Sequence, residues 1–195
     1  PVAHCVTYQP LTGRGIRPFL YSTYFAVNPA TFRYVSTPEY AEIHSLGFVW
    51  CTMLYELMQT FIDQYGMSDN IYEGANPVAG NPPAAAKGNN IATRLVIEGM
   101  KLQPNSPTFI QERDAILKAD TLLYGAQHAC KIWAAFAKRG LGYSAVSGTN
   151  GLGDEVESFD VPLSCNPNQK RIRIVKAGNA KVNNGDFIDY TIKVT

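Results

Sequence analysis

Residues 46–62 read LGFVWCTMLYELMQTFI, and this run decides the fold. Its apolar residues recur at spacings of three and four, which is the period of an α-helix and not that of a strand. Apolar side chains also flank the main stripe on both sides, so we expect a helix that is buried on most of its surface. The pattern comprises Leu46, Val49, Trp50, Met53, Leu54, Leu57, Met58, Phe61 and Ile62.

The flanking residues predict where this helix begins and ends. The stretch Ser36-Thr37-Pro38-Glu39 offers a hydroxyl cap, an early proline and a Glu three residues after Ser36, so we expect the helix to begin near residue 38. Gly66 follows the last apolar residues and is expected to end it. Three further segments have the same helical period: 90–103, 107–124 and 127–139.

These four helices predict a mainly α fold, packed as one helical bundle. The largest apolar residues on their inward faces form the expected core. These residues are Trp50, Leu54, Leu57, Ile116, Leu123, Trp133 and Phe136.

The amino-acid composition changes on either side of the predicted helical subdomain, residues 37–140. Residues 1–36 are rich in Pro, Gly, Thr and Tyr, and we interpret them as extended segments and turns. Residues 141–169 are rich in Gly, Ser, Asn and Asp and are interpreted as a loop or linker. In residues 170–195 the apolar period becomes two, with turn residues at 183–186, which predicts a short β-tail of strand, turn and strand. The alternating apolar residues are Ile172 and Ile174, then Ile188, Tyr190, Ile192 and Val194.

Two strands bury too little apolar surface to be stable by themselves, and an unpaired strand edge invites another strand. We therefore expect the β-tail to be completed from outside, by later strands of the same polypeptide, by a cleaved fragment or by a neighbouring chain. The alternative is that the tail folds back on the helical subdomain.

Composition excludes several function classes. The 195 residues are 46% hydrophobic and 17% charged, with a net charge of +1, so a sizeable core is expected and a nucleic-acid footprint is not. No apolar stretch reaches about 18 uninterrupted residues, so we expect no membrane span. We see no signal-peptide pattern in these residues, and because the sequence starts at Pro1 without an initiator Met we expect it to be a processed product or an excised segment.

The chain has four cysteines, and none of them stands in CxxC spacing, which argues against a zinc ribbon or a redox motif. An even number permits two disulfides. Our preferred pair is Cys130 with Cys165, because that bond would tie the last helix to the tail behind it. Cys51 lies inside the apolar helix pattern and is expected to be a free, buried thiol.

Glu42 and His44 lie just before the apolar run that begins at Leu46. The residues alone favour a histidine satisfied in the core or at a helix end over one that faces a site.

Four segments give His44 a different meaning. They are GRGIRPFLYST at 13–23, EIHSLGFVWCTMLYELMQTFID at 42–63, GNNIATRLVIEGMKLQPNSPTFIQERDAILKAD at 88–120 and CKIWAAFAKRGLG at 130–142. Together they resemble the C-terminal half of the fungalysin family, secreted zinc metallopeptidases related to the thermolysin type, over residues 13–162. The resemblance implies that His44 hydrogen-bonds the oxyanion of the tetrahedral intermediate and that Arg17 holds a substrate carbonyl. Both roles suit the residue types, because an imidazole donates to charge that develops in the transition state and a guanidinium fork positions a carbonyl.

The chain departs from this family where the metal is concerned. Fungalysins bind zinc on a helix reading His-Glu-x-x-His, with a further Glu downstream. The three histidines here are His4, His44 and His128, and none is four residues from another. We therefore expect no metal site and no cofactor in this chain, with the zinc of the intact family enzyme held by a half that precedes Pro1. The family also tends to have a cysteine in LQPC where this chain has Asn105, so Cys130 needs another partner or stays free.

The tail has a resemblance of its own. The stretch IVKAGNAKVNNGDFIDYTIKVT at 174–195 is similar to the opening of a small Ig-like repeat of secreted bacterial surface proteins. That resemblance implies a multidomain extracellular protein of bacterial origin.

Three functions follow. The first is the C-terminal part of a secreted zinc metalloendopeptidase, inactive alone, whose partner is a peptide or protein substrate once the zinc half is present. The second is a non-catalytic extracellular protein that reuses the peptidase fold and assembles through its β-tail. The third is a carbohydrate- or protein-binding module, for which the sequence offers only its 11 Tyr and 2 Trp.

Overall fold

The computed structural model describes residues 3, 5–6, 8–10, 12–13, 15–72, 86–148 and 153–166, and the backbone at 174–177 and 191–194. The chain divides into two compact units, Pro1–Cys165 and Asn166–Thr195. Among the described residues no helix is long and apolar enough to cross a membrane.

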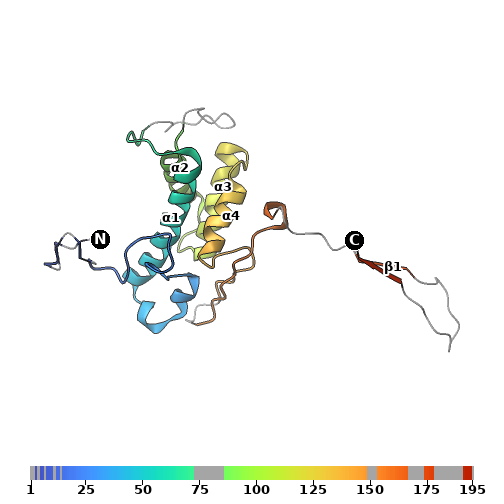
Figure 1. Ribbon diagram of the computed structural model, residues 1–195, viewed down its shortest axis with the longest axis horizontal. Coiled ribbons are helices and arrows are strands. Elements are labelled where there is room, and N and C mark those ends of the chain that lie inside the picture. The colour runs from blue at the N-terminus through green and yellow to red at the C-terminus, as the bar shows by residue number, and fades with distance from the viewer. Residues whose placement is uncertain are drawn as a thin grey trace. The chain divides into compact units, whose positions relative to one another are not determined.

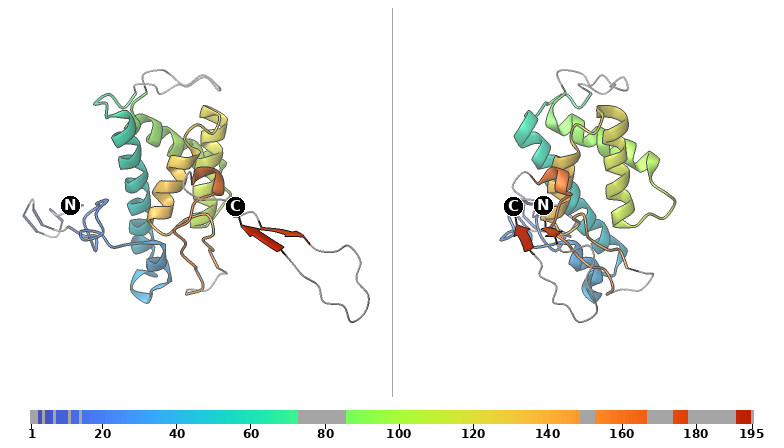
Figure 2. Two further views of the ribbon diagram at one scale, coloured as in Figure 1. Left: turned by 45° about the vertical axis from the view of Figure 1, so that its right-hand side comes forward. Right: turned by 90° about the vertical axis from the view of Figure 1, so that its right-hand side faces the viewer.

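The first unit is helical, as predicted. Its elements are α1 (Ile43–Tyr65), α2 (Gly88–Leu102), α3 (Phe109–Tyr124) and α4 (Ala129–Lys138), with short 3-10 turns η1 (Phe32–Ser36), η2 (Pro38–Tyr40) and η3 (Leu163–Cys165). Helix α1 packs against α2 and α4, and α3 packs against the same two helices. Figures 1 and 2 show the four helices as one bundle, with α1 as its longest member.

The second unit contains β1 (Ile174–Ala177) and β2 (Thr191–Val194). The two strands pair antiparallel, with Ile174 opposite Val194 and Ala177 opposite Thr191. This confirms the short β-tail of the predicted fold class. The predicted turn at 183–186, Ile172 and the side chains of both strands lie outside the described residues.

Helix α1 begins five residues later than the sequence predicted. Thr37, in the predicted cap, makes no side-chain capping bond to the helix, and its hydroxyl donates instead to the carbonyl of Tyr34. The cap is Glu42, whose carboxylate accepts the backbone N–H groups of His44 and Ser45 at 3.0 and 3.2 Å. A side-chain acceptor at this position satisfies N–H groups that the first turn leaves without partners.

Helix α3 also begins later than predicted, at Phe109, and its cap is Thr108. The Thr108 hydroxyl accepts from the Gln111 N–H, and the Gln111 side chain accepts from the Thr108 N–H. This reciprocal capping box outweighs the Ser-Pro pair just before it.

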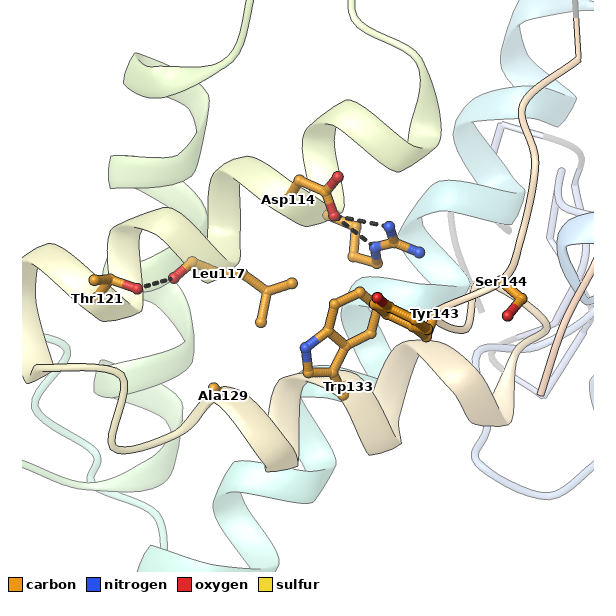
Figure 3. Close-up of a pocket in the computed structure, with 8 residues that line it drawn as sticks. Asp114, Leu117, Thr121, Ala129, Trp133, Tyr143 and Ser144 are labelled. Atoms are coloured by element: carbon orange, nitrogen blue, oxygen red, sulfur yellow. Dashed lines mark hydrogen bonds and ion pairs between the residues drawn. The ribbon is translucent and has the colours of Figure 1, made fainter. Parts of the chain in front are cut away.

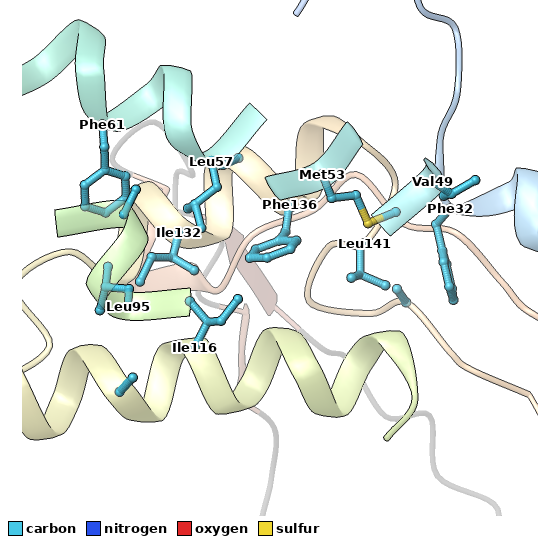
Figure 4. Packing of buried hydrophobic residues seen from close by; sticks show 14 of the residues in the cluster. Phe32, Val49, Met53, Leu57, Phe61, Leu95, Ile116, Ile132, Phe136 and Leu141 are labelled. Atoms are coloured by element: carbon cyan, nitrogen blue, oxygen red, sulfur yellow. The ribbon is translucent and has the colours of Figure 1, made fainter. Parts of the chain in front are cut away.

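One apolar cluster forms the core, and α1 supplies a row of it. Figure 4 shows Val49, Met53, Leu57 and Phe61 along α1, facing side chains from the other helices. Of the residues predicted for the core, Leu57, Ile116 and Phe136 are fully buried. Three more, Trp50, Leu54 and Leu123, are partly buried and pack against the cluster. Trp133 corrects the prediction, because it is only half-buried and lies at the edge of α4 beneath the Arg113 guanidinium.

Two glycines allow the helices to approach closely. A Cβ at Gly88 would come within 2.1 Å of the carbonyl oxygen of Phe61, and a Cβ at Gly99 within 2.9 Å of Ile116 Cγ1. Helix α2 can therefore cross α1 and α3 at these points only with glycine.

A buried arginine holds the N-terminal segment to the bundle. Arg139, just after α4, is 0% exposed, and its Nε donates to Glu56 Oε2 in the middle of α1 at 2.9 Å. Its Nη1 donates to the carbonyls of Asn28 and Ala30, and its Nη2 to that of Ser22. The guanidinium thus satisfies the backbone of a segment that has no regular structure of its own.

The preferred disulfide is confirmed. Cys130 on α4 is bonded to Cys165 on η3, so the chain after the bundle is fastened back to α4. Cys5 and Cys51 are free, and both are exposed. Cys51 was predicted to be free and buried, so its exposure is a correction that bears on the site below.

We predict that Arg139→Met lowers the free energy of unfolding by about 3–5 kcal/mol, because it leaves the Glu56 carboxylate and three carbonyls without the guanidinium. Urea unfolding followed by circular dichroism measures this change. The matched control is Arg33→Met, because Arg33 is exposed and its removal should change the same quantity by less than about 0.5 kcal/mol. Equal losses for the two variants would contradict the clamp.

A second prediction concerns pH, because Asp120 and His128 are both buried where α3 meets α4. Burial raises the pKa of Asp120 from 3.8 to about 6, against the His128 backbone N–H that donates to its Oδ2. Burial lowers the pKa of His128 from 6.5 to about 4, and the charge of Lys131 adds to this. Between pH 3.8 and about 6 the folded chain holds the Asp120 proton that the unfolded chain releases, so the contribution of Asp120 to stability falls as pH rises. For His128 the unfolded chain holds the extra proton, so that contribution rises with pH.

Replacing either residue by Asn removes its contribution to the pH dependence of the free energy of unfolding. Relative to wild type, Asp120→Asn should gain stability as pH rises from 4 to 6, and His128→Asn should lose stability as pH rises from 4 to 6.5. Urea unfolding of the three proteins at four pH values between 4 and 7 measures both differences. Variant-minus-wild-type curves that are flat, or that slope the same way, would show that the two groups do not carry these shifts.

Candidate functional site

The start of α1 presents a histidine to solvent. The His44 side chain is 71% exposed, and its Nδ1 is in close contact with Glu42 Oε1. The same carboxylate accepts the His44 backbone N–H, and these bonds lower the pKa of Glu42. Glu42 therefore has two tasks, because it caps the helix and also fixes the orientation of the imidazole. The other ring nitrogen, Nε2, makes no hydrogen bond within the described part of the chain.

The structure brings Arg17 to the same place. Its Nη1 donates to the backbone carbonyl of His44 at 3.1 Å, across 27 residues of sequence. Its Nε is buried without a hydrogen-bond partner among the described residues. The two residues singled out by the sequence are thus neighbours, with a guanidinium and an imidazole at one end of α1.

Tyr21 joins this pair. Burial raises the pKa of its phenol, as does Cys51, while the positive charge of Arg17 opposes the rise. The ring of Tyr21 also packs on Phe48 of α1, with 5.4 Å between ring centroids. Tyr21 therefore links the N-terminal segment that carries Arg17 to the helix that carries His44.

An apolar hollow of about 310 Å³ continues the site along α1. Its lining consists of Tyr21, Cys51, Leu54, Tyr55 and Met58. Cys51 is exposed here because it lies on the side of α1 that α2 and α4 do not cover. The same stripe includes Ile43, which is largely exposed, and Gly47, which has open space around it. The apolar pattern that predicted burial on most sides thus leaves one stripe of α1 open in the described chain.

Two further contacts hold the N-terminal segment across α1. Asn28 donates its side-chain N–H to Thr52 Oγ1 at 3.1 Å, and Phe19 packs against Phe48. With the Arg139 clamp, these contacts fix the segment on both sides of Tyr21. The positions of Arg17 and His44 relative to each other are therefore set by packing and not by the site residues alone.

Sequence reasoning missed Tyr21, Glu42 as the cap, and the Glu56–Arg139 pair. The signal for the pair was present, since Glu56 is a charged residue in the middle of an apolar helix and must be paired if buried. Tyr21 carried no such signal, because its role depends on a fold that brings residues 17–21 beside residue 51.

The described residues do not form a metal site. No three side chains of His, Cys, Asp or Glu converge anywhere in that part of the chain. His128 contacts Phe61 and Tyr65 at the far end of α1, about 30 Å from His44 at 1.5 Å per helical residue. His4 lies outside the described residues. The described residues therefore do not fit zinc.

The chain matches the family model described as fungalysin metallopeptidase (M36) over residues 2–145. It is 44% identical over 153 residues to an "Extracellular metalloproteinase" of Pyrenophora tritici-repentis, covering 78% of this chain and 22% of that protein. It is 48% identical over 132 residues to "Extracellular metalloproteinase 3" of Arthroderma gypseum, covering 68% and 20%. An "Extracellular metalloproteinase mep" of Aspergillus niger is 45% identical over 131 residues, covering 67% and 20%. The chain thus spans about a fifth of the length of these relatives.

Proposed function

This chain belongs to the fungalysin metallopeptidase family, and from that premise we propose that it is the C-terminal part of a secreted zinc metalloendopeptidase. It forms one side of the substrate cleft and does not cut peptides by itself. The observation that carries the proposal is the contact of Arg17 with the His44 carbonyl beside an exposed, carboxylate-oriented imidazole. The extracellular names of the relatives support a secreted location.

In this proposal His44 acts on the transition state. Its ring is held by Glu42 through Nδ1, so Nε2 is the nitrogen that faces substrate. Because Nδ1 donates to the Glu42 carboxylate, Nε2 is a donor in the imidazolium form of the ring. Its N–H, directed at the carbonyl oxygen, gains strength as that oxygen becomes negative, so the interaction accelerates the reaction more than it tightens substrate binding. Glu42 is a positioning residue, because it touches His44 and not the substrate.

Arg17 has a ground-state role. One guanidinium nitrogen is engaged by the His44 carbonyl, and the fork has other N–H donors to offer a peptide carbonyl. The contact also ties its position to the backbone of the residue that stabilises the oxyanion. Substrate alignment and transition-state stabilisation are therefore coupled through one backbone carbonyl.

Zinc and the general base come from outside these 195 residues. The described residues have no ligand set, and the sequence has no pair of histidines four apart. The open stripe of α1 and its apolar hollow support this arrangement, because an uncovered apolar helix face is where another part of the enzyme would pack.

The experiment is to produce this chain together with the residues that its gene encodes ahead of Pro1, and to assay peptide cleavage with and without a chelator. In that protein His44→Ala should lower kcat by about 100-fold to 1,000-fold with little change in KM. Arg17→Lys should raise KM, because an ammonium lacks the planar fork. Leu122→Ala, an exposed apolar residue on α3 outside both the open stripe of α1 and its hollow, is the control and should leave both constants unchanged.

Two results would contradict the proposal. One is a loss in His44→Ala confined to KM, which excludes an oxyanion role. The other is stoichiometric zinc and chelator-sensitive casein cleavage by the 195-residue chain alone.

A second role rests on the β-tail. Strands β1 and β2 pair with each other, and no third strand joins them within the described residues. A two-stranded sheet is marginal in water and leaves both edges open to another strand. This supports completion of the tail from outside by strands of an Ig-like unit, a retained fragment or a neighbouring chain, and hence an assembly function.

Deleting residues 170–195 tests the tail. The shortened chain should keep its helical circular dichroism, because the Cys130–Cys165 bond closes the helical unit before residue 170. It should lose the higher-order species that the full chain forms in analytical sedimentation. Unchanged association would refute the assembly role, and outright unfolding would favour a tail that packs on its own helical unit.

A further inference from the structure

A second recess lies between α3 and α4, and it shares no lining residue with the hollow on α1. It is an open groove of about 760 Å³ (Figure 3). Its lining consists of Arg113, Asp114, Leu117, Thr121, Ala129, Trp133, Tyr143 and Ser144. None of these residues has a part in the proposed peptidase site.

Two aromatic rings form a corner of the groove. The ring centroids of Trp133 and Tyr143 are 5.6 Å apart, and the ring planes meet at 74°. The Arg113 guanidinium lies 4.4 Å over the Trp133 ring and covers one face of it. Tyr143 is 59% exposed, so its ring offers open aromatic surface to solvent. Beside the two rings the groove surface is apolar, and the small side chain of Ala129 leaves space there.

The polar groups of the groove are predominantly acceptors. Arg113 Nε and Nη2 both contact Asp114 Oδ1, at 2.9 and 2.8 Å, which leaves Oδ2 of that 53% exposed side chain available. The hydroxyls of Thr121 and Ser144 donate to the Leu117 carbonyl and to Asp160, so their lone pairs remain for a ligand. Because Arg113 balances Asp114, the groove carries no net charge.

One donor complements them. The Trp133 indole N–H makes no hydrogen bond within the described chain, and Figure 3 shows the indole nitrogen turned toward Ala129 and the groove.

The corner is fixed before any ligand arrives. Arg113 Nη1 donates to the carbonyls of Leu141 and Gly142, just ahead of Tyr143. The backbone N–H of Tyr143 donates to the Asp160 carbonyl, and the Ser144 N–H and hydroxyl donate to the Asp160 carboxylate at 2.9 and 2.6 Å. The bonds from Ser144 lower the pKa of Asp160 to about 2, so the carboxylate that holds Ser144 stays ionised at neutral pH. A rigid site loses less entropy on binding than a mobile one.

We propose that this groove binds a saccharide unit of a glycan. A pyranose ring has an apolar C–H face that packs on an aromatic ring, and its hydroxyls donate to carboxylate and hydroxyl acceptors. It is uncharged, as the groove is. A ligand with a net charge of either sign would find no unpaired counter-charge in the groove, because Arg113 and Asp114 neutralise each other.

Fluorescence of Trp133 tests the proposal in the full chain. The chain has two tryptophans, so Trp50→Phe leaves Trp133 as the only reporter, and a phenyl ring preserves the packing of Trp50 on Phe109 and Phe136. The probes are maltohexaose, cellohexaose, chitohexaose and mannohexaose. At least one should give a saturable change in Trp133 emission, with saturation transfer from aromatic protons to the sugar C–H protons in NMR.

Variants at exposed positions locate the site. Tyr143→Ala and Asp114→Ala should each raise the dissociation constant about tenfold, which is the effect of losing one aromatic contact or one hydrogen bond. These positions are chosen because neither belongs to the core cluster. Tyr24→Ala, an exposed tyrosine outside the groove, is the matched control and should bind as before. The helical circular dichroism of each variant is compared first.

Three outcomes would overturn the proposal. One is no response to any of the four oligosaccharides. Another is binding that Tyr143→Ala and Asp114→Ala leave unchanged. The third is a Trp133 response to tetramethylammonium or to a lysine-rich peptide in place of the sugars, which would make the groove a site for cations.

Discussion

The buried guanidinium of Arg139 is the interaction on which the rest of this structure depends. A charge with no solvent exposure is tolerable only if its donors are satisfied, and this one has the Glu56 carboxylate and the carbonyls of Ser22, Asn28 and Ala30. The three carbonyls belong to a segment without helix or strand, so they have no ladder to enter. One side chain therefore replaces the hydrogen bonds that regular structure would have supplied.

The segment that Arg139 fixes in turn positions the candidate site. Once residues 22–30 are fixed on α1, Tyr21 packs on Phe48 and Arg17 reaches the His44 carbonyl. Glu42 completes the arrangement from the helix side, because the carboxylate that caps α1 also holds the imidazole. The geometry at the start of α1 thus depends on a charge pair in the middle of that helix, and loss of Glu56 or Arg139 would disturb the site although neither residue contacts Arg17 or His44.

Local patterns were enough to predict the helices, and nonlocal contacts account for most of what the sequence did not reveal. The period of Leu46–Ile62 specifies α1, and the stops at Gly66 and Pro104 follow from backbone chemistry. The start of α1 was misplaced because the cap was predicted in Ser36-Thr37-Pro38-Glu39 and Glu42 was missed, and tertiary contacts such as the bond from the Ser36 hydroxyl to Glu155 were not visible in the sequence. Arg17 and His44 were found through a resemblance and not through spacing, since 27 residues separate them. Cys51 and Trp133 were assigned to the core because an apolar residue in a helix carries no mark of the side that stays uncovered.

Arg113 repeats the logic of Arg139 on the other side of the bundle. It too is a buried guanidinium that donates to an acidic partner, Asp114, and to carbonyls of an irregular segment, here Leu141 and Gly142. Each arginine thereby fixes a stretch of non-helical chain against helices, and each stretch carries an aromatic residue that lines a recess, Tyr21 in one case and Tyr143 in the other. A helical bundle this small has little surface that is both rigid and irregular, and irregular surface is where recesses for ligands form. Both recesses described above lie where a buried arginine has made the irregular backbone rigid, because a site built on the helices alone would be flat and one built on an untethered loop would not hold its shape.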